Sequence, residues 1–180
     1  MKEVIIPVGP QGSGKSFFCE KAVKADPNLV LISRDKILIE LFGGVFLSPY
    51  SGEHFHAYDM MWRKVREQIR NTPEYRVILD TWNGTRQERA TIIQKLRKLG
   101  AKRIVGWYFV TPVEAVNEWF WKKPEVAKSS DMRSRQGQNL TFFSDDAPIR
   151  DHALFHRLAS EIDSEGFDEI VRINPVVIVP

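Results

Sequence analysis

A glycine-rich segment around one lysine is the part of this sequence most clearly suited to chemistry. Gly9-Pro10-Gln11-Gly12-Ser13-Gly14-Lys15-Ser16 fits the pattern G-x-x-x-x-G-K-[ST]. Glycines let successive backbone N–H groups turn toward phosphate oxygens, and a following helix start adds free donors and partial positive charge. The lysine supplies a point charge to the β- and γ-phosphates, and the serine hydroxyl can complete a Mg²⁺ shell. The motif therefore predicts binding of a nucleoside triphosphate with Mg²⁺, through Gly12, Ser13, Gly14, Lys15, Ser16 and Phe17.

Two carboxylates follow later apolar runs and can meet this loop. Asp80 ends the run Val77–Leu79 in the manner of a Walker B strand, which predicts a place near Mg²⁺. Asp35 follows the run Leu29–Ile32 after two residues. It is either the N-cap of the next helix or a carboxylate that accepts the proton of an attacking hydroxyl. Its position alone does not separate these two roles.

The elements that must hold these residues alternate along the chain. Short apolar runs occur at Val4–Val8, Leu29–Ile32, Val77–Leu79, Ile104–Val110 and Glu169–Ile173. They are continuous, as expected for strands buried on both faces, and segments with helical punctuation separate them. We therefore expect an α/β fold with a parallel sheet and right-handed crossovers. Pro7 lies inside the first run, where it costs a ladder bond near the strand end.

Helix signals are clearest in one segment. Thr85-Arg86-Gln87-Glu88 fits a capping box, and Gly100 stands where that helix should end. Pro112 suits the start of another helix. The helical segments thus have defined ends on either side of the fourth apolar run.

Two stretches interrupt the alternation. Gly43–Gly52 is rich in turn residues, and Lys122–Pro148 is long and polar. A loop of the second length predicts a lid, although a solvated loop with scattered charges is the plainer interpretation. Arg133 and Arg135 lie in this insert and are predicted to neutralise charge on a transferring phosphate.

Composition sets wider limits. The chain has 180 residues, a net charge of +3 and one cysteine, Cys19. We expect a single domain over residues 1–180, with the lid at about 122–148, and no intramolecular disulfide. No apolar stretch is long enough to span a bilayer, and the N-terminus lacks a secretory layout, so we expect a cytoplasmic protein. No N-K-x-D segment occurs, which disfavours a GTPase.

Three motifs together resemble a known family. Gly12-Ser13-Gly14-Lys15-Ser16, Ser33-Arg34-Asp35 and Asp80-Thr81-Trp82-Asn83 look like those of P-loop polynucleotide 5′-hydroxyl kinases, a set that extends to seryl-tRNA and zeta-toxin-like kinases. The resemblance implies transfer of the γ-phosphoryl group of ATP·Mg²⁺ to a hydroxyl, with the 5′-OH of RNA or DNA as the preferred acceptor. It implies that Asp35 is the general base. Asp80 and Asn83 would lie near the phosphates or the acceptor sugar, and Arg34 would border the acceptor channel. The resemblance also implies the α/β fold of a P-loop kinase, with a five-stranded parallel sheet, helices on both faces and a lid. Apart from the resemblance, the position of Trp82 soon after Asp80 predicts stacking on a substrate base.

The chain departs from this family at two places. The position three residues after Asp35 is Leu38, where the family pattern has an arginine that grips the acceptor phosphate. This departure favours the alternative of a small-molecule, nucleotide-sugar or aminoacyl-tRNA acceptor. The lid helix, Asn117–Lys123, has no arginine, so the lid cation must be Lys122, Lys123 or an arginine of the insert. A third hypothesis is an ATP-binding switch that transfers nothing and instead orders the insert.

Overall fold

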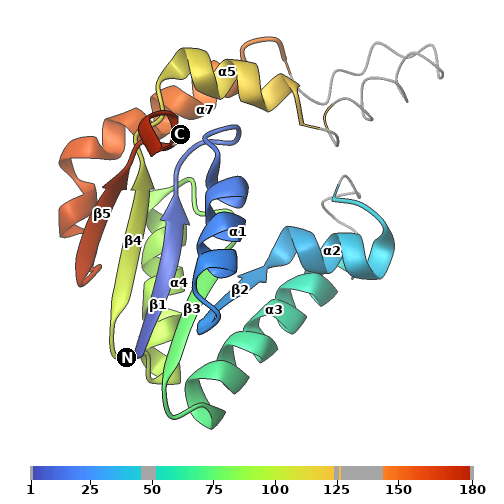
Figure 1. Cartoon of the computed structure of the whole chain (residues 1–180), viewed down its shortest axis with the longest axis vertical. Coiled ribbons are helices and arrows are strands. Elements are labelled where there is room, and N and C mark those ends of the chain that lie inside the picture. The colour runs from blue at the N-terminus through green and yellow to red at the C-terminus, as the bar shows by residue number, and fades with distance from the viewer. Residues whose placement is uncertain (1, 46–51, 124–125, 127–143, 179–180) are drawn as a thin grey trace.

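The computed structural model describes residues 2–45, 52–123, 126 and 144–178. Five strands form one sheet in the order β2-β3-β1-β4-β5, and every neighbouring pair is parallel (Figure 1). The strands are β1 (Lys2–Val8), β2 (Leu29–Ser33), β3 (Tyr75–Asp80), β4 (Ile104–Phe109) and β5 (Glu169–Ile173). The α/β fold with a five-stranded parallel sheet is confirmed, and the predicted apolar runs fall on the five strands.

Helices cover both faces of the sheet. They are α1 (Lys15–Ala25), α2 (Arg34–Phe42), α3 (Gly52–Asn71), α4 (Arg86–Leu99), α5 (Val113–Trp121), α7 (Ala147–His156) and α8 (Pro175–Ile178), with short 3₁₀ turns η1 (Arg157–Ser160) and η2 (Ile162–Ser164). The smaller apolar core lies under α1 and contains Cys19, Ile5 and Ile78. The larger core packs α3, α4 and the segment after α7 on the other face.

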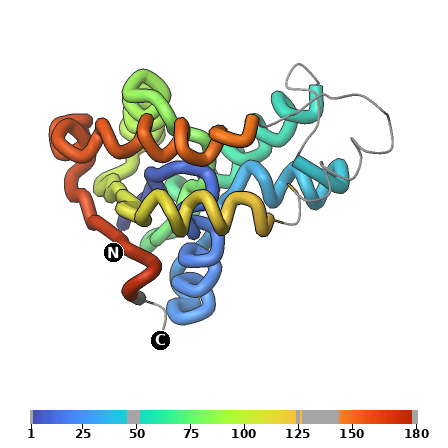
Figure 2. The backbone as a smooth tube through the Cα atoms, turned by 90° about the horizontal axis from the view of Figure 1, so that it is seen from above, coloured from blue at the N-terminus to red at the C-terminus, as the bar shows by residue number. Residues whose placement is uncertain are grey.

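The position of α5 and α7 matters most for function. Seen from above, the two helices run side by side across the end of the molecule where the strands finish (Figure 2). The loop between β1 and α1 lies below them. Chemistry in open parallel sheets gathers at this end, beyond the carboxyl ends of the strands.

Helix boundaries follow local chemistry. Thr85 accepts a hydrogen bond from the Glu88 N–H while the Glu88 carboxylate accepts one from the Thr85 N–H, which confirms the capping box. Gly100 ends the same helix at a φ of 97°, in the left-handed region that favours glycine. At α2 one alternative is wrong: Asp35 is not the N-cap. Ser33 takes that place, because its backbone is extended and its hydroxyl accepts from the Lys36 N–H.

One predicted boundary also changes. The expected insert ended at Pro148, but Ala147 already belongs to α7, because Pro148 suits a first helical turn. Arg133 and Arg135 lie outside the described residues. Pro7 belongs to β1, one residue before its end, and its carbonyl accepts a hydrogen bond from the side chain of Asn83.

Within the described ranges, no helix has the length and apolar character needed to cross a membrane. The same ranges contain no group of three or more His, Cys, Asp or Glu side chains arranged to hold a metal ion. Cys19 is fully buried, and this burial raises the pKa of its thiol to about 12. The thiol therefore stays protonated and packs as a small apolar side chain.

Candidate functional site

The glycine-rich loop is shaped by two residues with positive φ. Gly12 and Gly14 have φ values of 84° and 85°, and Gly14 directly precedes α1. A Cβ atom added at Gly12 would lie 2.6 Å from the Val116 carbonyl oxygen of α5. The loop therefore needs glycine here for its conformation and for the close approach of α5.

The lysine of the motif folds over its own loop. Lys15 Nζ donates to the carbonyl oxygens of Gly9 at 2.7 Å and Pro10 at 2.6 Å. Burial lowers the pKa of Lys15 to about 8, against the opposing attraction of Asp80. An ammonium held this way is a poorly hydrated positive charge, which an anionic group entering the loop would stabilise.

Two neighbouring strands bring the acids together. In the β2–β3 register Ser33 stands opposite Asp80, and the Ser33 hydroxyl donates to Asp80 Oδ2 at 3.3 Å. Burial, the largest cause, and the negative charge of Asp35 both raise the pKa of Asp80, while Lys15 works against them. Asp80 thus lies in the field of both the lysine and the second acid.

Asp35 lies at the start of α2 and is open to solvent. Its side chain is 59% exposed, and its Oδ1 accepts from the Arg34 guanidinium at 3.1 Å. Because Ser33 performs the capping, the Asp35 carboxylate is not occupied by the helix N-terminus. Its oxygens remain able to accept a proton or a hydrogen bond from a bound hydroxyl.

One cleft of about 190 Å³ joins the loop and these acids. The predicted residues that line it are Lys15, Ser16, Arg34, Asp35, Asp80, Trp82 and Asn83. The lining also includes Gln11, Val45, Lys123 and Val126. The structure therefore brings together residues from the ends of β1, β2 and β3 in one cleft.

Trp82 and Asn83 differ in whether their side chains are available to an acceptor. Asn83 is buried, and its side-chain amide donates to the carbonyl oxygens of Pro7 at 2.9 Å and Thr81 at 3.0 Å. Trp82 is 37% exposed and packs edge-on against Phe155, with ring centroids 6.0 Å apart. Trp82 thus offers a free surface to the cleft, whereas the Asn83 amide is already used to hold the loop.

A second cavity, of about 630 Å³, borders the same glycine-rich loop. Its walls include Phe17, Trp119, Lys122, Lys123 and Pro175 together with Gly12–Ser16. Aromatic and proline surfaces suit a flat, apolar group such as a nucleobase. Of the aromatic cluster 119–121, Phe120 is buried in the interior while Trp119 faces this cavity.

Four residues of the site were missed by the sequence reasoning. The Asp151 carboxylate accepts from the Gln11 N–H of the loop at 3.2 Å, and burial raises the pKa of Asp151. The Thr111 hydroxyl donates to the Ser13 carbonyl at 2.8 Å, and His152 contacts the Thr111 carbonyl at 3.1 Å. The fourth, Arg89, reaches the loop after β3. No spacing in the sequence links these residues to the loops they hold.

The donor set fits a triphosphate with Mg²⁺. The Ser16 hydroxyl and the Asp80 carboxylate line the same cleft as Lys15, and hydroxyl and carboxylate oxygens are ligands that Mg²⁺ prefers. The positive φ of Gly12 and Gly14 is the backbone conformation that lets successive N–H groups form an anion-binding loop.

Comparison with known proteins agrees with this geometry. A chain of the structure described as "Structure of the Pnkp1/Rnl/Hen1 RNA repair complex" is similar over 89% of this chain and 46% of its own, at 22% identity and a TM-score of 0.63. A chain of a second structure, "Structure of Pnkp1/Rnl/Hen1 complex", is 25% identical over 65% of this chain and 38% of its own, with a TM-score of 0.56. This protein therefore spans less than half the length of those chains.

A shikimate kinase shares the fold over most of both chains. The enzyme from Acinetobacter baumannii, in complex with shikimate, is 13% identical over 97% of this chain and 84% of its own, with a TM-score of 0.57. No curated protein matches the chain. The fold that the resemblance implies, that of a P-loop kinase, is confirmed. A family model described as an AAA domain (AAA_33) matches residues 4–142, so the chain belongs to this family and has the fold of a P-loop kinase.

Proposed function

We propose that this protein is an ATP-dependent kinase that transfers the γ-phosphoryl group to a hydroxyl, with the 5′-OH of RNA or DNA as the preferred acceptor. One observation carries the proposal: Asp35 lines the same cleft as Lys15 and Ser16. A carboxylate across from a phosphate-binding loop is the arrangement that phosphoryl transfer to an alcohol requires.

Each side chain has a definable task in this reaction. The acceptor oxygen forms a bond to the γ-phosphorus, the bond from that phosphorus to the β–γ bridging oxygen breaks, and ADP leaves. Asp35 accepts the hydroxyl proton. The N–H groups of the loop and Lys15 hold the triphosphate, and Ser16 and Asp80 are the residues that would hold Mg²⁺. When bound, this ion offsets negative charge on the phosphates.

The cation that acts on the transferring phosphate belongs to the same proposal. Arg133 and Arg135 stay predictions, because they lie outside the described residues. In the part of the chain that the structure describes, Lys123 lines both the cleft and the second cavity. Lys122 instead pairs with Glu118 on the helix surface. Lys123 is therefore the better placed of the two lysines.

One observation favours a second candidate, a kinase of a small hydroxyl compound. Leu38 is fully buried in the larger core, so this position contributes nothing to the cleft. Arg34 is then the cation that α2 offers to an acceptor phosphate. A single cation is enough for a small acceptor, whereas a polynucleotide engages several phosphates.

An acceptor panel tests both candidates. The protein is incubated with γ-labelled ATP and Mg²⁺ in the presence of 5′-OH RNA and DNA oligonucleotides, the same oligonucleotides with a 5′-phosphate, nucleosides, sugar nucleotides and shikimate. We expect label on the 5′-OH oligonucleotides and none on their 5′-phosphorylated controls. Label on small compounds alone would favour the second candidate. ATP binding without label on any acceptor would reject the proposed transfer and leave a nucleotide-binding switch.

A further inference from the structure

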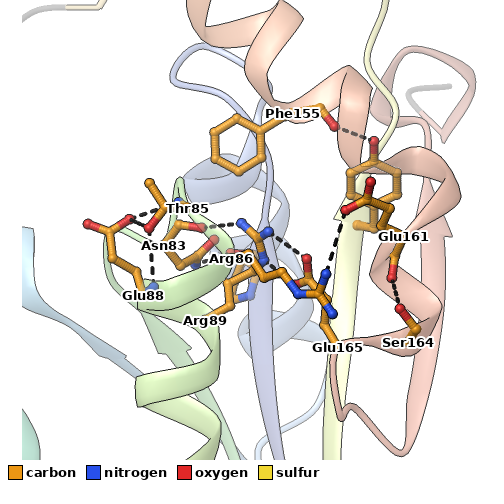
Figure 3. A network of polar contacts seen from close by, with 11 residues as sticks. Asn83, Thr85, Arg86, Glu88, Arg89, Phe155, Glu161, Ser164 and Glu165 are labelled. Carbon is orange, nitrogen blue, oxygen red and sulfur yellow. Dashed lines mark hydrogen bonds and ion pairs between the residues drawn. The ribbon is translucent and has the colours of Figure 1, made fainter.

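A buried ion pair lies behind the cleft. Arg89 of α4 and Glu165, which follows η2, are 0% and 1% exposed. The guanidinium grips the carboxylate through two bonds, Nε to Oε2 at 2.5 Å and Nη2 to Oε1 at 2.8 Å. Its remaining nitrogen, Nη1, donates to the Asn83 carbonyl at 2.8 Å (Figure 3). Arg89 thus connects Glu165 to the backbone of the loop after β3.

That loop, Thr81–Gly84, depends on distant contacts for its shape. The Asn83 side chain ties it to β1 through the Pro7 carbonyl, and the Trp82 ring rests against Phe155 of α7. A Cβ atom at Gly84 would come within 2.3 Å of the Trp82 ring, so the ring lies directly over the backbone. Arg89 is the contact that holds the carbonyl side of the same loop.

Stability alone is a weak reason for such a pair. Replacing a buried ion pair with apolar side chains of similar volume is often neutral or stabilising, because both charges lose hydration on burial. Apolar side chains, however, have no third donor to hold a backbone carbonyl. The bond from Nη1 to the Asn83 carbonyl is therefore the feature that an apolar core cannot reproduce.

We propose that Arg89, oriented by Glu165, is a positioning residue that fixes loop Thr81–Gly84 and thereby the place of Trp82 in the cleft. The inference rests on the proposed function, which makes this part of the cleft the acceptor site. It adds a residue with no contact to the cleft, because Arg89 is buried behind the loop. Misplacing a binding group by about 1 Å can cost on the order of 100-fold in rate.

The test removes the pair while keeping the fold. In the double variant Arg89→Met/Glu165→Leu both charges are lost together, so neither is left unpaired. The matched control is Arg97→Met, which removes another arginine of α4 that donates to a nearby carboxylate, Asp168 at 2.7 Å, but does not bond to loop Thr81–Gly84. The readouts are kcat, separate KM values for acceptor and ATP, and hydrogen exchange of the 81–84 amides.

We expect the double variant to raise the acceptor KM by about 10- to 100-fold, with the KM for ATP unchanged and faster exchange confined to 81–84. Arg97→Met should show none of these changes. Arg89→Lys keeps the charge but loses the planar guanidinium, so it should raise the acceptor KM by a smaller factor. This variant also tests the inference if the double variant does not fold.

A folded double variant with unchanged acceptor KM and unchanged exchange would overturn the inference. Equal losses toward ATP and acceptor, or the same losses in Arg97→Met, would also overturn it, because they indicate a general effect on the fold. If the wild-type protein labels no acceptor, the proposed function fails, and the exchange of 81–84 decides the positioning role by itself.

Discussion

The two sides of the cleft are built in different ways. The donor side, Gly9–Ser16, is one continuous segment, and its lysine is held by carbonyl groups five and six residues away. The acceptor side consists of Arg34, Asp35 and the segment Asp80–Asn83, which lie more than forty residues apart in the chain. Pairing of β2 with β3 brings them together.

The donor side is therefore shaped by contacts within one short segment, whereas the acceptor side is shaped by contacts between distant segments. A glycine-rich loop between a strand and a helix shapes itself through backbone conformations that its own residues dictate. The acceptor side depends on the strand register, on the Ser33–Asp80 hydrogen bond and on Arg89 behind it. Changes on the donor side should therefore alter ATP binding, whereas changes to Asp35 or to loop Thr81–Gly84 should alter transfer while leaving ATP bound.

Asp35→Asn should have the largest effect, on the acceptor side. An amide cannot take the hydroxyl proton, so we expect kcat to fall by about 10²–10⁴-fold with the Kd for ATP unchanged. Steady-state transfer and calorimetric ATP binding check this. Glu40→Gln, which neutralises another exposed acid of α2, is the matched control and should leave both values unchanged. Full activity of Asp35→Asn would remove Asp35 from the mechanism.

Gly12→Ala should break the donor side. A left-handed backbone costs an alanine about 1–2 kcal/mol, and the added Cβ would meet the Val116 carbonyl at 2.6 Å. We expect the Kd for ATP to rise at least about tenfold. Gly44→Ala is the control, since no atom lies within 4 Å of its added Cβ. Unchanged ATP affinity in Gly12→Ala would mean that the loop does not form the phosphate site.

The pH dependence of ATP binding tests the role of Lys15 on the donor side. The pKa of Lys15 is lowered to about 8, so the side chain is charged below that pH and loses its proton above it. Only the charged form attracts phosphate, so affinity should fall by up to about tenfold between pH 8 and pH 9. Lys15→Arg keeps its charge throughout this range, and its affinity, whatever its absolute value, should not change with pH. An equally steep decline in both proteins would assign the titration to another group.

Ser33→Ala should have the smallest effect and tests how the acceptor side is tied together. It removes the N-cap of α2 and the bond to Asp80, so we expect a loss of about 1 kcal/mol in the free energy of unfolding. Ser33→Gly, a residue tolerated at N-caps, should recover most of this loss without restoring the Asp80 bond. Urea unfolding measures the free energy of unfolding. The acceptor KM of both variants reports what the Ser33–Asp80 bond contributes to acceptor binding. A normal acceptor KM in Ser33→Gly would show that the Asp80 bond is dispensable.

The sequence predicted the fold well because its signals are local. Continuous apolar runs, the Thr85–Glu88 capping box and Gly100 each depend on neighbours within a few residues, and all three were confirmed. The N-cap of α2 was not found from sequence: Asp35 was weighed for that role, but the structure gives it to Ser33, because both residue types cap helices and only backbone geometry decides which one does.

The site was predicted less completely than the fold. The residues at the strand ends could be named because parallel strands finish at one edge of a sheet. Arg89, Thr111, Asp151 and His152 could not, because each contacts the site from a helix or loop whose place depends on packing. Leu38 marked a departure from the family pattern, and the structure adds that it belongs to the core.

The amino-acid sequence by itself determined the phosphate-binding loop and the alternation of strands and helices, because glycine freedom, apolar runs and capping side chains act over a few residues. Only the tertiary structure decided that Asp35 and Asp80 share one cleft with the loop, which arginine supports the segment after β3 and which aromatic ring faces a cavity. Those outcomes join residues far apart in the chain, and such contacts form only when the whole sheet has closed the loops between them.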